Sequence, residues 1–166
     1  MATPKTQRTG TDLAGHLDAL PPARQPLARA VADVFARATG ETAVLWGSIV
    51  GYGTTTTTSG GRTHEWPAVG FAVRGTRVAV YGLRSGPDAE ELLARLGPHE
   101  AAVSCVYLRR LGGEVGGADV DVLTELVRLG HARSAVTGAC QPGSPLLLDR
   151  VLSTTSMSPP PHAELR

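Results

Sequence analysis

Two β-prone runs that meet at a Gly-Thr dipeptide, residues 75–76, constrain this chain more than any other feature. Glycine in the first position of a two-residue loop favours a type II′ turn, so residues 69–74 and 77–83 are predicted to form an antiparallel hairpin. The turn fixes the register, with Phe71 opposite Val80. Alternation then places the bulky residues on one face: Val69, Phe71, Val73, Val78 and Val80. The other face receives small groups and one tyrosine: Ala68, Gly70, Ala72, Ala79, Tyr81 and Leu83.

The two faces of this hairpin predict different environments. The bulky aliphatic face is the predicted core. The face of small residues requires either a helix that approaches the strands closely or a shallow pocket. Which of the two occurs depends on where the helices pack.

Apolar residues at helical spacing predict helices on both sides of the hairpin. The first two occupy residues 11–20 and 27–38, with Gly40 just past the end of the second. Two more follow at residues 88–96 and 119–129, with Gly130 marking the end of the last. Strands are predicted from Ala43 onward, through the run Thr54 to Thr58, from Pro67 at a strand start, and over residues 104–110. The predicted fold class is therefore α+β, a two-layer antiparallel β-sheet packed by N- and C-terminal α-helices.

The length of 166 residues and 42% hydrophobic content suit one domain, predicted over residues 11–133. Residues 1–10 are predicted to be a disordered leader, and 134–166 a mostly disordered tail rich in Pro and Ser. Within this tail, Leu146, Leu147 and Leu148 form the one segment that could dock on the domain or on a partner.

The charge balance and the cysteine content exclude several classes of protein. Sixteen Lys and Arg against fifteen Asp and Glu leave no basic surface for nucleic acid. No apolar run approaches the roughly 20 residues of a membrane helix, and the N-terminus lacks the apolar core of a signal peptide. Cys105 and Cys140 stand far apart, which favours a reduced compartment. We predict a cytoplasmic protein with no nucleic-acid or membrane partner; its oligomeric state does not follow from the sequence.

Catalytic and cofactor motifs are missing or broken. There is no P-loop, and Thr56 stands where a dinucleotide fingerprint starting at Gly51 needs glycine. The spacing around Ser48 does not fit a nucleophile elbow, and Pro67 breaks the helix that a zinc motif at His64 needs. The sequence thus favours a protein without a cofactor that is not an enzyme.

Large rings beside the face of small residues are the strongest candidates for a binding site, because a concave site uses such rings to bury apolar surface. The predicted ligand-binding residues are Trp46, Tyr52, Trp66, Tyr81, Tyr107 and Arg74, the last opposite Arg77 at the hairpin tip. The alternative is that the rings fill a second layer of the core and that both arginines are solvated. No metal site is predicted; the one combination considered is Cys105 with His99 and His64, and Cys105 in a strand is more typical of a small buried residue.

Short motifs in a fixed order are similar to those of the YdhG-like family of domains of unknown function. They are Trp46-Gly47, Gly51-Tyr52-Gly53, Ser59-Gly60-Gly61-Arg62, Trp66-Pro67, Val69-Gly70-Phe71, Ser104-Cys105-Val106-Tyr107-Leu108 and the Asp-capped last helix. The resemblance covers residues 11–133. It implies a compact α+β fold with an antiparallel sheet, and one branch of the family is regarded as frataxin-like and tied to iron delivery.

The chain departs from the family pattern at two places, with Thr54 to Thr58 where many relatives have aromatics, and with Glu100-Ala101-Ala102-Val103 where they have glycine and lysines. An iron site would also need clustered carboxylates, whereas Asp12, Asp18 and Asp33 are scattered. The leading hypothesis is therefore a non-enzymatic domain that binds a small ligand or a protein partner, and the alternative is a protein that handles iron or another metal.

Overall fold

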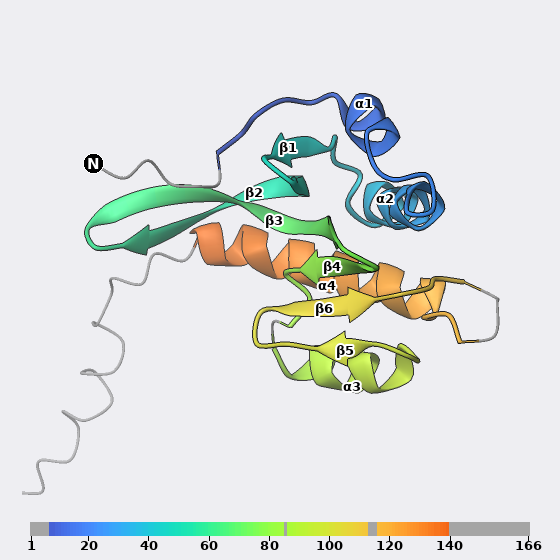
Figure 1. Cartoon of the computed structure of the whole chain (residues 1–166). Coiled ribbons are helices and arrows are strands. Elements are labelled where there is room, and N and C mark those ends of the chain that lie inside the picture. The colour runs from blue at the N-terminus through green and yellow to red at the C-terminus, as the bar shows by residue number, and fades with distance from the viewer. Residues whose placement is uncertain (1–6, 85, 113–115, 140–166) are drawn as a thin grey trace, which may run out of the picture.

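The computed structural model describes residues 7–84, 86–112 and 116–139, which form an α+β fold (Figure 1). In chain order the elements are α1 Leu13–Asp18, α2 Gln25–Thr39, β1 Val44–Trp46, β2 Ile49–Ser59, β3 Arg62–Arg74, β4 Arg77–Tyr81, α3 Pro87–Arg95, β5 Glu100–Ala101, β6 Cys105–Leu108 and α4 Val120–Ala139. Among the described residues, no helix combines the length and the apolar character that crossing a membrane requires.

The six strands form one antiparallel sheet in the order β1-β2-β3-β4-β6-β5. The predicted hairpin is confirmed as β3 and β4, with Phe71 opposite Val80 and Gly70 opposite Tyr81. Gly75 has a φ of 59°, the conformation that the first loop residue of a type II′ turn requires. A local turn signal therefore fixed the pairing at the centre of the sheet.

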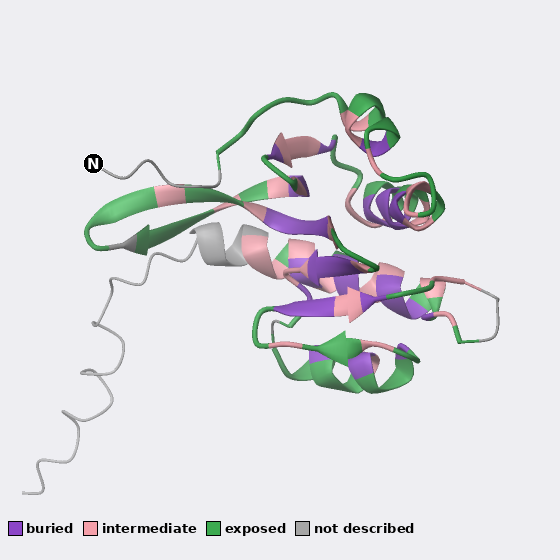
Figure 2. Ribbon diagram, viewed as in Figure 1, coloured by how far each residue is buried: buried purple, intermediate pink, exposed green. Residues whose placement is uncertain are grey.

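All four helices pack on the same face of this sheet. Their buried residues share one core cluster with the inward side chains of the strands: Val50, Tyr52, Val69, Phe71, Val78, Val80, Val106 and Leu108. Phe35 of α2 lies at the centre, with its ring 5.3 Å from that of Tyr52 and 5.5 Å from that of Phe71. Figure 1 shows α4 running behind the strands, and Figure 2 shows the buried residues on the inner strands. The predicted two-layer arrangement is confirmed.

Capping residues account for several helix ends but not for the end of α4. Asp12 caps α1 by accepting from the Gly15 amide, and Gly40 ends α2 with a φ of 67°. Asp119 caps α4 by accepting from the amide of Val122 at 3.1 Å. Gly130 was predicted to end this last helix, and that prediction is wrong: α4 continues through it to Ala139.

The physical reason for Gly130 is a close approach between α4 and the chain after β4. A Cβ at position 130 would lie 2.3 Å from the carbonyl oxygen of Gly82. Glycine is therefore needed there for packing rather than for a helix end. As a result, residues 134–139, predicted to begin the tail, belong to α4, whereas Leu146, Leu147 and Leu148 lie outside the described residues.

Other sequence predictions need correction at the edges of the sheet. The predicted leader is ordered at its end, because the Thr9 amide donates to the Leu45 carbonyl at 2.8 Å and the Leu45 amide donates to Gly10 at 2.7 Å. Leu83 belongs to the core rather than to the face of small residues, since the chain turns at Gly82, where φ is 86°.

The outer halves of β2 and β3 form a two-stranded ribbon, residues 54–67, here called the arm. It extends beyond the other strands in Figure 1, and most of its residues are exposed in Figure 2. Pro67 therefore lies inside β3 and not at its start as predicted. The position tolerates proline because β4 pairs only with residues 70–74 of β3, so no strand on that edge needs an amide from Pro67.

Candidate functional site

The second face of the sheet is called here the bare face, because the helices of the described chain all pack on the other side. Strand alternation and pairing assign to it Val44, Trp46, Ile49, Gly51, Gly70, Ala72, Arg74, Arg77, Ala79, Tyr81, Glu100, Cys105 and Tyr107. Arg109 follows β6 on the same side and bonds to Glu100. The bare face thus runs from β1 at one edge to β5 at the other.

The centre of the bare face is apolar, which is unusual for the outward side of a two-layer sheet. Such sheets normally alternate apolar residues inward with polar residues outward. Here Ala72 and Ala79 are both buried, and both lie outside the core cluster formed with the helices. Tyr81 and Tyr107, beside them, are half-buried. The charged side chains that the described strands place on this face, Arg74, Arg77 and Glu100, lie toward the hairpin tip and the β5 edge.

At the β1 end of the bare face, the indole of Trp46 lies over Gly51. A Cβ on Gly51 would be 2.8 Å from the indole Nε1, so only glycine leaves room for the ring. The guanidinium of Arg8 covers the indole at 5.2 Å from the ring centroid, and it also donates to Thr54 Oγ1 at 2.8 Å. Trp46 is 3% exposed, and its buried Nε1 has no hydrogen-bond partner. This end of the face is already covered.

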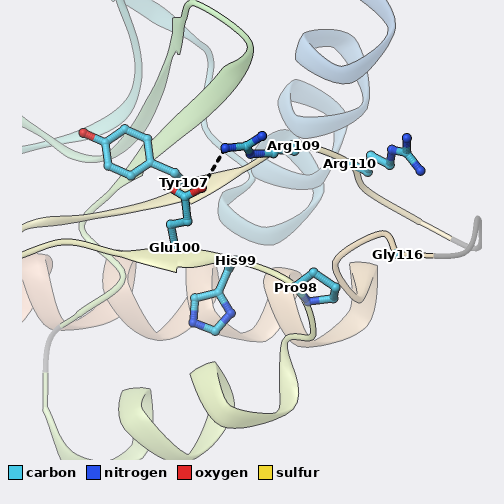
Figure 3. A pocket seen from close by; sticks show the side chains of 7 residues that line it. All are labelled: Pro98, His99, Glu100, Tyr107, Arg109, Arg110 and Gly116. Carbon is cyan, nitrogen blue, oxygen red and sulfur yellow. Dashed lines mark hydrogen bonds and ion pairs between the residues drawn. The ribbon is translucent and has the colours of Figure 1, made fainter.

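At the opposite end, a cavity of about 380 Å³ opens beside Tyr107 (Figure 3). The residues that line it are Pro98, His99, Glu100, Tyr107, Arg109, Arg110 and Gly116. They come from the α3–β5 connection, from β5, from β6 and from the segment after β6. The bare face and the cavity meet at Tyr107, because its ring belongs to both.

Two arginines and one carboxylate form a cluster of contacts at this end of the face. Glu100 accepts through Oε1 from Arg109 Nη2 at 3.0 Å, and through Oε2 from Arg77 Nη1. The guanidinium of Arg77 also lies over the Tyr107 ring, 4.7 Å from its centroid. The tyrosine ring and the carboxylate are therefore held by the same arginine.

The protonation states follow from these contacts. The hydrogen bond from Arg109 lowers the pKa of Glu100, and the positive charges of Arg77 and Arg109 lower it further. The pKa of Tyr107 is raised, first by its hydrogen bond with the Cys105 side chain. At neutral pH the cluster thus contains an ionised carboxylate between two cations, beside a neutral phenol.

The structure separates the six residues predicted to bind a ligand. Trp46, Tyr81, Tyr107 and Arg74 lie on the bare face, and of these Tyr107 lines the cavity while Arg74 is exposed at the hairpin tip. Tyr52 is in the core and not on this face: its hydroxyl donates to the Ala32 carbonyl at 3.3 Å. Its prediction as a site residue is therefore corrected.

Trp66 also departs from the predicted grouping, although it is 38% exposed. Gly53 in β2 has a φ of 69°, which interrupts the alternation where β2 pairs with this part of β3. Pro67 consequently packs near Gly51 on the bare-face side. Neighbouring residues in a strand point to opposite faces, so Trp66 points away from Trp46. The two indoles do not share a surface.

Sequence reasoning missed Glu100, gave Arg109 no role and considered Arg77 only as the residue opposite Arg74 at the hairpin tip. One signal was available. Residues two apart in a strand lie on the same face, which places Arg109 with Tyr107 and Arg77 with Ala79. No such signal existed for Glu100, because β5 has two residues and is too short for a periodic pattern.

The described residues contain no group of three or more His, Cys, Asp or Glu side chains that could hold a metal ion. The three residues considered from the sequence have separate environments. Cys105 is buried in β6, His64 lies on the arm, and the Nδ1 of His99 is 2.7 Å from the Gly97 carbonyl oxygen. Comparison of the chain with protein-family models, with curated proteins and with solved structures found no match.

Proposed function

We propose that this protein is a non-catalytic binding domain that holds a small ligand on the Tyr81–Tyr107 half of the bare face. The observation that carries the proposal is the apolar centre of a sheet face that no helix of the described chain covers. Ala72 and Ala79 are buried by their neighbours, so the accessible apolar surface of this half comes from the half-buried rings of Tyr81 and Tyr107, and accessible apolar surface of this kind is where a ligand can bind. On the order of its sequence motifs, we also propose that the chain belongs to the YdhG-like family.

Two features favour a small ligand over a large partner. The cavity of about 380 Å³ beside Tyr107 falls within the range of roughly 300–1,000 Å³ that small-molecule sites occupy. Its lining places Pro98 and the Tyr107 ring beside charged and polar side chains, and polar groups of this kind orient a ligand in a small-molecule site. The Trp46 half is the less suitable end, because Arg8 already stacks on the indole.

Methyl NMR during a screen of small molecules tests this proposal. The methyl groups of Ala72, Ala79 and Ile49 report on the bare face, and those of Val31 and Leu126 report on the helix side. We expect shifts to concentrate on the first group. Shifts confined to the helix side, or none with any compound, would refute a site on the bare face.

Two substitutions distinguish binding at the bare face from non-specific binding to exposed apolar side chains. Tyr81→Ser removes one half-buried ring and should weaken any hit by at least tenfold. Val103→Ser is the matched control, because Val103 is apolar and 96% exposed but lies off the bare face. Sedimentation of the free protein adds a third readout: a dimer broken by Tyr81→Ser would show that a second copy, and not a small ligand, occupies the face.

A further inference from the structure

We propose that the ligand is a small organic anion, with its apolar or aromatic body against Tyr107 and its oxyanion on the guanidinium of Arg109. This inference rests on the proposed function and names the chemical class that the cavity accepts. It is argued from the hydrogen-bonding capacity of the cavity wall, from its charge and from the position of the tyrosine ring.

The polar wall has more hydrogen-bond donors than acceptors. Both oxygens of Glu100 are engaged, Oε1 by Arg109 and Oε2 by Arg77. A guanidinium carries five N–H donors, and Arg109, which is 66% exposed, donates one of them to Glu100. The wall therefore offers donors to a ligand, and a ligand that supplies acceptors fits it. A ligand cation would have to displace an arginine from Glu100.

Charge leads to the same class of ligand. Arg77 and Arg109 contribute two positive charges and Glu100 one negative charge, and the lowered pKa of the carboxyl keeps it ionised at neutral pH. This cluster is cationic until an anion binds. Carboxylates and other planar oxyanions accept two parallel hydrogen bonds from one guanidinium, which orients the ligand as well as holding it.

The apolar part of the ligand has a defined wall. The guanidinium of Arg77 stacks on the Tyr107 ring at 4.7 Å from the ring centroid and restricts its movement. The cavity opens beside this ring. In Figure 3, Tyr107 lies on one side of the Glu100–Arg109 pair and Pro98 on the other. A body the size of one aromatic ring can therefore lie on the phenol while its oxyanion reaches Arg109.

Titration calorimetry with four probes tests the class: benzoate, benzamide, cyclohexanecarboxylate and benzylammonium. We expect both carboxylates to bind, and benzamide, which has the same shape as benzoate without its charge, to bind at least tenfold more weakly. Benzylammonium should not bind. Equal affinity for benzoate and benzamide, or a preference for benzylammonium, would overturn the inference.

Two variants sharpen the test. Arg109→Gln should weaken benzoate binding by tenfold or more, whereas Arg128→Gln should leave it unchanged. Arg128 is a matched control because it is 60% exposed and paired with Glu125 at 2.9 Å on α4, away from the cavity. Glu100→Gln should tighten benzoate binding three- to tenfold, because it removes the carboxylate that competes for Arg109. Weaker binding in this variant would mean that Glu100 itself faces the ligand, and it would refute an anion site.

The methyl screen distinguishes failure of this inference from failure of the proposed function. Neutral compounds that shift the bare-face methyls while benzoate does not would overturn the anion class and leave the binding face in place. If no compound, benzoate included, shifts those methyl signals, both the anion class and the binding face would be refuted.

Discussion

Replacing Gly130 by alanine tests how closely α4 approaches the backbone at Gly82, just after β4. In a helix interior, alanine is normally more stable than glycine by about 1 kcal/mol. At this position, however, the new Cβ would lie 2.3 Å from the Gly82 carbonyl oxygen and 3.1 Å from Val69 Cγ1. We therefore expect the usual sign to reverse.

The magnitude follows from what has to move. The contact with Gly82 is with backbone, so α4 must shift by about 1 Å to reach ordinary van der Waals separation. Leu123, Leu126 and Val127 on the same helix are fully buried, and the shift disturbs their packing. Overpacking of this kind costs about 3 kcal/mol at the upper end of its range, which leaves a net loss of about 2 kcal/mol after the gain in helix propensity.

Urea denaturation followed by circular dichroism measures this change. We expect Gly130→Ala to lower the midpoint with an unchanged slope, and to lower Tm by about 8 °C. The exposed Ala132 supplies the control, because Ala132→Gly should cost only the helix propensity, about 1 kcal/mol. A Gly130→Ala variant as stable as the parent would contradict the close approach of α4 to Gly82.

Two further predictions concern Tyr52 and Arg8. Burial, with a smaller effect from a nearby carboxylate, raises the pKa of Tyr52 to about 12, so between pH 10 and 12 the unfolded chain loses a proton that the folded protein keeps. Tyr52 should make the free energy of unfolding fall by about 1.4 kcal/mol per pH unit over that interval. Tyr52→Phe should remove this contribution in urea titrations and leave only the slope that the raised pKa of Tyr107 adds, and an unchanged slope in Tyr52→Phe would refute the assignment. Arg8→Gln should uncover the indole of Trp46 and increase its quenching by acrylamide, measured in a Trp66→Phe background, while costing less than about 1 kcal/mol of stability. The similarly exposed Arg29→Gln is the control, and equal quenching in both variants would show that Arg8 does not cover the ring.

The sequence predicted those parts of the fold that depend on local signals. Gly75 at the turn was enough to set the pairing of β3 with β4, and Asp119 was enough to place the start of α4. Gly130 misled the prediction because its reason is a tertiary contact, which a pattern along one helix does not contain.

The candidate site was only partly predictable for a related reason. Tyr107 could be assigned to the correct face because β6 alternates regularly. Trp66 could not, because the irregularity at this point of the ribbon involves Gly53 on the neighbouring strand β2, and a sequence does not show that a glycine has adopted a positive φ. Glu100 reaches the site through β5, whose pairing with β6 depends on chain folding after α3.

The arm gives the molecule a practical point of attachment. Its tip, Gly60-Gly61, has φ values of 58° and 74° and lies at the end of the ribbon in Figure 1, on the opposite side of the sheet from β5. Exposed tips of small residues are where proteins best accept inserted sequence. A biotin acceptor peptide or fluorescent label spliced into this turn would tether the domain to a sensor surface and leave the Tyr107 cavity open to solution.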